Sequence, residues 1–264
     1  MSERYTHGHH ASVLRSHRWR TATNSAAYLL GRLSAGQDLL DVGCGPGTIT
    51  RDFARIVAPG IVVGIDLEAT VIRQAAQAST EDNVTFQIGD VYALPFADCS
   101  FDVVHAHQLL QHLADPVQAL MEMRRVLRPG GLVAVRDADY AGFVWYPADA
   151  LLDRWLRLYH ELTAHNGAQA DAGRRLLSWV QAAGFSDAVM TSATWTFADP
   201  DARSWWGGLW ADRVELSDFA QQAVGYELST PHELAAIAEA FRRWIDQPDG
   251  AFIVAHGEVI STKN

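Results

Sequence analysis

The sequence predicts an α/β protein built on a doubly wound, mostly parallel sheet. Short apolar runs alternate with amphipathic helical segments between residues 39 and 135, which is the pattern of successive strand–helix–strand units. A glycine-rich turn, Gly43 to Gly47, joins the first of these runs to its helix, and the next run ends in a carboxylate, Asp66. Together these features predict a nucleotide-binding crevice at the carboxyl edge of the sheet.

Composition narrows the class of protein. The 264 residues are 48% hydrophobic and 20% charged, which is ordinary for a globular chain, and we expect one domain over residues 1–264. The net charge of −10 argues against a nucleic-acid surface, which needs a basic face. Cys44 and Cys99 cannot form a disulfide framework, and no apolar run approaches the ~18 residues of a membrane span. We expect a cytoplasmic protein, monomeric or homodimeric, with no membrane or nucleic-acid partner.

Residues 1–35 are predicted to fold over the mouth of the crevice as an N-terminal cap. Ser12 to Leu33 carries an apolar stripe at helical spacing and predicts one helix, which Gly36 ends. Tyr5 and Arg20 would then contact the ligand, Arg20 through charge-assisted hydrogen bonds to a carboxylate. A capping tyrosine and a solvated arginine fit the sequence equally well.

The crevice begins with a strand over Leu39 to Val42 and continues into a helix over Ile49 to Val57. The glycines between them allow φ > 0 and let a ligand approach the backbone closely. A dinucleotide fingerprint needs G-x-G-x-x-G, but Thr48 stands at the third glycine position, and Pro46 removes an N–H that a diphosphate would use. The turn therefore suits a nucleoside without phosphates, such as S-adenosylmethionine, better than a dinucleotide.

The second and third strands are predicted over Ile61 to Ile65 and Val84 to Ile88, with a helix over Ala69 to Ser79 between them. Asp66, which ends the second strand, can accept hydrogen bonds from both hydroxyls of a ribose; the alternative is a helix cap. Asp90 follows the third strand and can accept a hydrogen bond from an adenine amino group.

The fourth and fifth strands are predicted over Phe101 to Ala106 and Leu132 to Val135. The helix between them starts at Asp115-Pro116, where Asp is a good N-cap and Pro a good first residue. The run Arg128-Pro129-Gly130-Gly131 is predicted to stop it.

Five motifs now stand in order along the chain: DVGCGPGT, GID, GDVYALPFADCSFDVV, HQLLQHLADP and RRVLRPGG. Over residues 39–135 this series resembles the ubiquinone/menaquinone-biosynthesis-type branch of class I S-adenosylmethionine-dependent methyltransferases. The resemblance implies a Rossmann-like sheet of seven strands whose last strand is antiparallel.

The resemblance also implies roles for individual residues. The methionine moiety of S-adenosylmethionine would be surrounded by Asp41, Gly43, Gly45 and Thr48. Ribose and adenine would be contacted by Asp66 and Leu67, and adenine also by Asp90 and Val91. His107 would lie beside the sulfonium, where the family usually has a small or amide residue.

After residue 136, a helix is predicted over Arg174 to Ala183 and the last two strands over Val189 to Phe197 and Ala251 to Ile260. Residues 140–170 and 200–247 are predicted to be helical lid insertions that select the substrate. Eight of the nine tryptophans follow residue 140. They could line an apolar or aromatic pocket, hold an amine by cation–π contact, or form a small core that joins the insertions to the sheet.

The predicted function is methyl transfer from S-adenosylmethionine to O, N or C of a small, apolar or aromatic molecule. Histidine is the natural base near neutral pH, so His107 and His112 are the candidate catalytic residues, with Asp137 and His160 as further candidate bases. No metal requirement is predicted. The alternatives are a cofactor-binding protein of the same fold that has lost or changed its activity, and a nicotinamide-dependent oxidoreductase.

Overall fold

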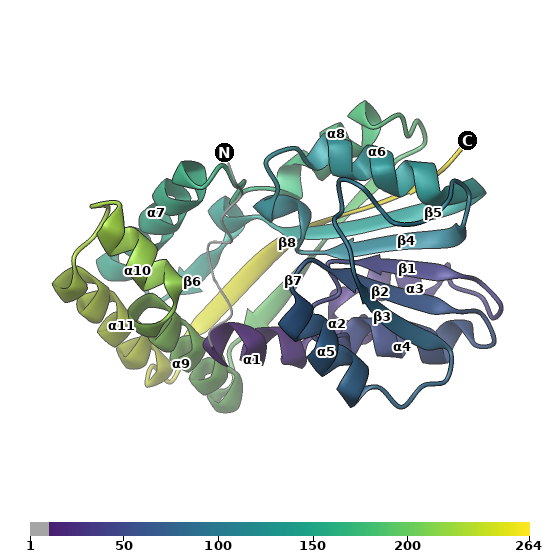
Figure 1. Ribbon diagram of the computed structural model, residues 1–264. Coiled ribbons are helices and arrows are strands. Elements are labelled where there is room, and N and C mark those ends of the chain that lie inside the picture. Colours follow the sequence, from purple (N-terminus) through teal and green to yellow (C-terminus); the bar gives the residue numbers. More distant parts are fainter. Residues whose placement is uncertain (1–10) are drawn as a thin grey trace.

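The computed structural model describes residues 11–264, and a single mixed sheet runs through it (Figure 1). Its parallel part consists of β1 (Leu39–Val42), β2 (Val62–Asp66), β3 (Val84–Ile88), β4 (Phe101–His107) and β5 (Leu127–Ala138). Three further strands complete it: β6 (Val144–Tyr146), β7 (Val189–Phe197) and β8 (Ala251–Thr262). The order is β3-β2-β1-β4-β5-β8-β6, and β7 also pairs with β8.

The predicted Rossmann-like, doubly wound fold is confirmed, with one strand more than expected. The last strand, β8, is antiparallel to β5, as predicted. The unpredicted strand is β6, which pairs with Ala251 to Ile253 at the start of β8. Its three residues are too few to show a strand pattern in the sequence. The strand forms by pairing with a partner that lies about a hundred residues away along the chain.

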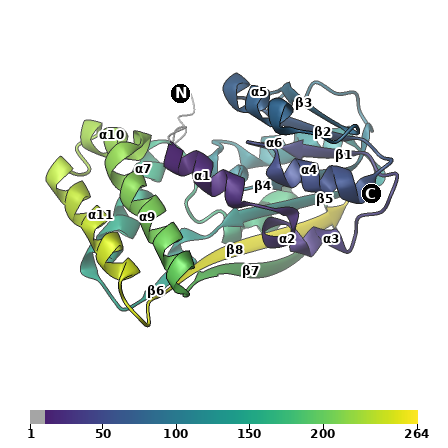
Figure 2. The same ribbon diagram turned by 90° about the horizontal axis from the view of Figure 1, so that it is seen from below.

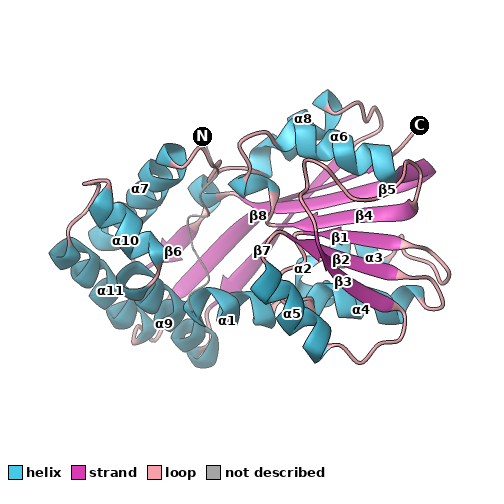
Figure 3. Cartoon of the chain, viewed as in Figure 1, coloured by secondary structure: helices cyan, strands magenta, loops and turns pink. Residues whose placement is uncertain are grey.

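Helices cover both faces of the parallel sheet (Figure 3). The connections on one face are α4 (Thr48–Val57) and α5 (Ala69–Ala78), and those on the other are α6 (Pro116–Val126) and α8 (Leu176–Ala182). Asp115 caps α6 as predicted, because its Oδ1 accepts the N–H of Gln118 at 2.9 Å. Short 3₁₀ turns stand at Leu110–His112, Tyr140–Gly142 and Gly173–Arg175.

The prediction of one helix from Ser12 to Leu33 is wrong. The segment forms three short helices, α1 (Ala11–Trp19), α2 (Ala22–Ser25) and α3 (Ala27–Leu30). A capping box opens α2, since Thr21 Oγ1 accepts the N–H of Asn24 while Asn24 Oδ1 accepts that of Thr21. These reciprocal hydrogen bonds start a new helix and end the continuous one.

The fifth strand is longer than predicted. Helix α6 ends at Val126, and the run predicted to be a stop is already part of β5. Leu127 pairs with Phe101, and a register shift separates that pair from the next, Val103 with Leu132. The strand therefore includes the Pro129-Gly130-Gly131 segment, where its pairing with β4 is irregular. This extension depends on the pairing with β4 and not on the local sequence.

Residues 140–170 and 200–247 pack together beside the sheet, and we call them the helical lobe. Its helices are α7 (Ala150–His165), α9 (Pro200–Leu216), α10 (Asp218–Gly225) and α11 (Pro231–Ile245). Helix α1 packs against α9, so the N-terminal segment spans the join between lobe and sheet (Figure 2). Within residues 11–264, no helix has the length and apolar character that crossing a bilayer requires.

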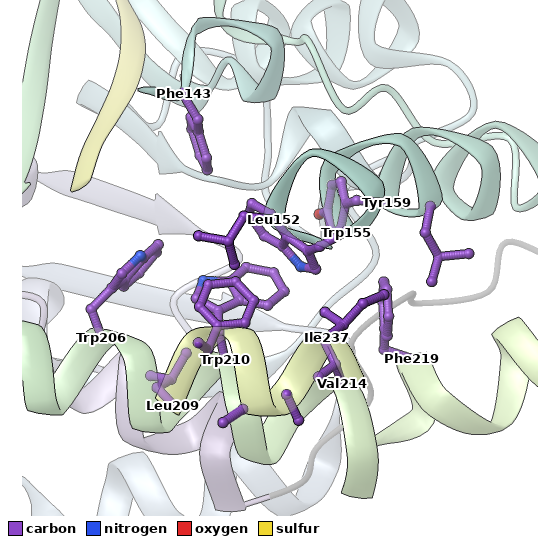
Figure 4. Close-up of a cluster of buried hydrophobic side chains, with 14 of the residues drawn as sticks. Phe143, Leu152, Trp155, Tyr159, Trp206, Leu209, Trp210, Val214, Phe219 and Ile237 are labelled. Atoms are coloured by element: carbon purple, nitrogen blue, oxygen red, sulfur yellow. The ribbon is translucent and has the colours of Figure 1, made fainter. Parts of the chain in front are cut away.

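The tryptophans give the helical lobe its core. Trp155 of α7 and Trp210 of α9 have no exposed surface, and their ring centroids lie 4.5 Å apart (Figure 4). Phe241 of α11 lies 5.2 Å from Trp155 by the same measure. Edge-to-face contacts of this kind stabilise a core beyond the area they bury. Some of the aromatic residues therefore form a core of the helical lobe, which is one of the roles that the sequence analysis considered for the tryptophans.

Candidate active site

The glycine turn is locked to the end of the neighbouring strand. Gly43, Gly45 and Gly47 all have positive φ, and Gly47 precedes the first turn of α4. Asp66 Oδ2 accepts the N–H of Gly45 at 3.0 Å, and its Oδ1 accepts the N–H of Glu68 at the same distance. One carboxylate thus holds both loops at the carboxyl ends of β1 and β2.

A cavity of about 280 Å³ begins at this turn and extends into the helical lobe. Nine residues predicted from the sequence line it: Arg20, Asp41, Gly43, Gly45, Thr48, Asp66, Leu67, His107 and His112. From the other side it is lined by Tyr140, Phe143, Trp195, Trp205, Trp206 and Trp210. The glycine turn and the tryptophan-rich part of the chain therefore line the same cavity.

Three predicted residues are not among the lining. Asp90 is exposed, and its Oδ1 accepts the N–H of Tyr92 at 2.9 Å. Val91 packs into the core beneath α6. Tyr5 lies outside the described residues. The adenine contacts of Asp90 and Val91 and the ligand contact of Tyr5 stay predictions.

Asp41 lines the cavity, but its carboxylate is already committed to the protein. The residue is 3% exposed. Its Oδ1 lies 2.7 Å from His105 Nδ1 on β4, and its Oδ2 accepts the hydroxyl of Thr50 on α4 at 2.6 Å. Asp41 therefore ties β1 to β4 and α4, and its predicted place beside the methionine moiety stays a prediction.

His107 and His112 line the cavity, yet their environment opposes the predicted role of general base. Burial, followed by the charges of Arg20 and Arg136, holds the pKa of His107 well below its ordinary value. Burial, followed by Arg20 and Arg213, lowers the pKa of His112 from 6.5 to about 3. Both rings are therefore neutral and weakly basic, whereas a base for neutral pH needs a pKa near 7.

The other two candidate bases lie outside the cavity lining. Asp137 is fully buried, and its Oδ1 accepts the N–H of Gln111 at 3.1 Å. His160 is engaged on both sides, with Nε2 2.9 Å from Asp171 Oδ1 and Nδ1 2.8 Å from the carbonyl oxygen of Leu156. Neither side chain is placed to touch a molecule in the cavity.

Comparison with known proteins identifies the family. A family model described as a methyltransferase domain matches residues 40–135. Over 270 residues the chain is 33% identical to an uncharacterized methyltransferase of Schizosaccharomyces pombe, and the match covers 98% of this chain and 96% of that protein. The chain belongs to the methyltransferase family.

Two further comparisons agree with this assignment. The methyltransferase is 42% identical over 106 residues to a ubiquinone/menaquinone biosynthesis C-methyltransferase of Hahella chejuensis, across 38% of this chain and 43% of that protein. The crystal structure of YcgJ from Bacillus subtilis superposes with a TM-score of 0.60 at 21% identity, covering 92% of this chain and 99% of that one. The predicted family resemblance and fold are confirmed.

The residues at the glycine turn fit S-adenosylmethionine, the methyl donor that this family implies. Asp66 offers a carboxylate for a ribose diol, and Leu67 beside it is 73% exposed, which leaves an apolar face for a purine. A Cβ added to Gly45 would meet only His17 Nδ1, at 3.9 Å, so open space stands in front of that backbone. The methyltransferase thus presents polar and apolar groups that match a nucleoside. Pro46 has no backbone N–H that could bind a phosphate.

Gln108 and Arg213 are among the cavity residues that sequence reasoning missed. Gln108 has a φ of 50° and bridges two distant segments, since its Oε1 accepts from Arg20 Nη2 at 2.5 Å and its Nε2 lies 2.9 Å from His256 Nε2. Arg213 of α9 donates from Nη2 to Ser16 Oγ at 3.1 Å. Nothing in the local sequence of either residue signals the site, because their partners come from other parts of the chain.

Among residues 11–264 of the methyltransferase, no cluster of three or more His, Cys, Asp or Glu side chains is placed to hold a metal ion. The prediction of no metal requirement is therefore left to experiment.

Asp137 is expected to make stability fall as pH rises. Burial raises its pKa from 3.8 to about 8, so its contribution to stability is fully present below 3.8 and is lost as pH rises toward about 8. In Asp137→Asn that loss should be absent while the hydrogen bond from Gln111 can be kept. Urea unfolding across this range should show the variant gaining stability relative to the wild type with increasing pH, by at most about 1.4 kcal/mol per pH unit; a constant difference would contradict it.

Proposed function

We propose that this methyltransferase moves the methyl group of S-adenosylmethionine to an oxygen, nitrogen or carbon atom of a small, apolar or aromatic molecule held in the same cavity. The observation that carries the proposal is the continuity of that cavity. It runs from the glycine turn between β1 and α4 to the aromatic side chains of the helical lobe. Such a space, mostly apolar with a few convergent polar groups, is the usual form of a small-molecule site.

The cofactor is proposed to lie along the carboxyl ends of β1, β2 and β4. Asp66 and Leu67 would contact its ribose and adenine, with Asp90 and Val91 further along the purine. Its methionine part would lie against the backbone of Gly43 and Gly45 and the side chain of Thr48, with Arg20, and Tyr5 from the undescribed segment, at the carboxylate. His107 would stand beside the sulfonium.

When bound, S-adenosylmethionine supplies an electrophilic methyl group on a positively charged sulfur. The chain's own contribution is to orient the two reactants and to keep water out. Trp206 and Trp210 are buried, and with Tyr140 they close the far end of the cavity. Neutral His107 and His112, which also line the cavity, can donate or accept a hydrogen bond without carrying charge.

The test is formation of S-adenosylhomocysteine in the presence of small phenols, amines and activated carbon acids. We expect turnover that requires both S-adenosylmethionine and one class of acceptor, with the labelled methyl group recovered in the acceptor. Tight binding of S-adenosylhomocysteine without transfer to any acceptor would instead favour the alternative, a cofactor-binding protein of the same fold with lost or different activity.

A further inference from the structure

The end of the cavity that lies in the helical lobe carries a buried positive charge. Arg213 lines it, is 5% exposed, and holds its guanidinium 4.6 Å from the centroid of the Trp210 ring. It keeps its hydrogen bond to Ser16. A charge in such a water-poor space acts more strongly than at a surface. Its field reaches the neighbouring cavity wall, where Arg20 and Arg213 both contribute to the lowered pKa of His112.

The carboxylates of the cavity lie at its opposite end. Among the described residues, those that line it are Asp41, Asp66 and Glu68, next to the glycine turn. Asp41 binds His105 and Thr50, Asp66 accepts two backbone N–H groups, and Glu68 Oε1 accepts the N–H of Thr70 at 3.1 Å. With respect to the described lining residues, an ammonium group placed among the tryptophans would therefore meet Arg213 at the end away from these carboxylates, whereas Arg213 would stabilise an anion there.

His107 offers hydrogen bonds that the protein leaves unused. It is 6% exposed and lines the cavity between its two ends. Within the part of the chain that the structure describes, neither of its ring nitrogens has a hydrogen-bond partner. Buried polar groups are nearly always paired, so this imidazole calls for a polar atom of a bound molecule. A neutral imidazole donates one N–H, which an oxygen can accept.

On the basis of the proposed function, we propose that the acceptor is an aromatic molecule with an acidic hydroxyl group, of the phenol type, and that it binds as its oxyanion. The ring would lie against the side chains of Trp206, Trp210 and Tyr140 that line the cavity, with the oxygen toward the N–H of His107 and within the field of Arg213.

Ionisation on binding removes the need for a base in the cavity. The hydroxyl proton leaves to solvent as the phenol binds. The oxyanion then forms an O–CH₃ bond while the CH₃–S⁺ bond breaks, and the electron pair of the broken bond stays on sulfur. An oxyanion and a sulfonium thus become a methyl ether and a neutral thioether. A reaction that needs no base in the cavity agrees with the weak basicity of His107 and His112.

The experiment is a spectroscopic titration of a chromophoric phenol bound to the complex with S-adenosylhomocysteine. The probes are para-nitrophenol and a nitronaphthol, whose oxyanions absorb at longer wavelength than the neutral forms. We expect the bound phenol to ionise at a pH lower than the free phenol by about one unit or more, which is a tenfold change in its ionisation constant. Arg213→Met keeps an unbranched side chain on Trp210 but should abolish the shift, whereas Arg213→Lys should retain most of it.

Three results would overturn the proposal. The bound phenol could ionise at the same or a higher pH than in solution. No phenol of the series could bind to the wild-type complex. Or para-nitrobenzylamine, which carries an ammonium group, could displace the phenol at lower concentration than the phenol itself binds. The titration of the wild-type complex tests for the first two of these results without any variant. Failure of S-adenosylhomocysteine to bind would instead refute the proposed function, and calorimetry reports that separately.

Discussion

Asp66→Asn is expected to weaken the binding of S-adenosylhomocysteine by roughly 10- to 100-fold. Asp66 stands at the end of β2, lines the cavity and accepts the N–H of Gly45. Removing its charge replaces charge-assisted hydrogen bonds, each of about 1.5–3 kcal/mol, by weaker neutral ones to the ribose. The same substitution also loosens the glycine turn, which adds to the loss.

Isothermal calorimetry measures this loss directly. The matched control is Asp82→Asn, which removes the same charge at an exposed position before β3 that does not line the cavity. We expect Asp82→Asn to bind as the wild type does. Equal affinities for the two variants would show that Asp66 does not hold the ribose, and the cofactor placement would have to be revised.

Trp155→Ala is expected to lower the free energy of unfolding by about 3–5 kcal/mol. The side chain is fully buried where α7, α9 and α11 meet. Its ring contacts those of Trp210, Phe241 and Phe252, with centroids 4.5, 5.2 and 6.1 Å away. Truncation leaves a large cavity that these rigid rings cannot fill, so the transfer loss and the cavity cost add.

Chemical denaturation provides the measurement, with Trp179→Ala as the control. Trp179 lies on α8 and is only partly buried against the core, so its truncation should cost less than half as much. If the two substitutions cost the same, the aromatic cluster would not be what holds the helical lobe together.

Much of the parallel sheet could be predicted because its signals are local. The strands Leu39–Val42 and Val84–Ile88 have the expected bounds, since turn-forming residues flank each of them in the sequence. The glycine turn and Asp66 were also placed correctly at adjacent strand ends. Short-range patterns of this kind do not depend on what folds next to them.

The remainder depends on partners that are remote in sequence. Strand β6 exists because β8 pairs with it, and β5 extends back to Leu127 because Phe101 lies opposite. The sequence placed His107 at the end of β4, but its weak basicity comes from burial and from Arg20 and Arg136, which the fold brings to it. Arg213 reaches the cavity beside Ser16, 197 residues away along the chain.

The most direct test of the account compares two glycine substitutions by calorimetric titration with S-adenosylhomocysteine. Gly45 and Gly36 both have positive φ, and an added methyl group meets no atom within 3.5 Å at either, so both substitutions place alanine in a strained backbone conformation without a steric clash. Only Gly45 lines the cavity. We predict that Gly36→Ala binds one equivalent as the wild type does, while Gly45→Ala binds about tenfold more weakly or worse, since one crowded methyl group costs about 1–3 kcal/mol. Equal binding by the two variants, or no binding by the wild type, would contradict a cofactor site at this turn.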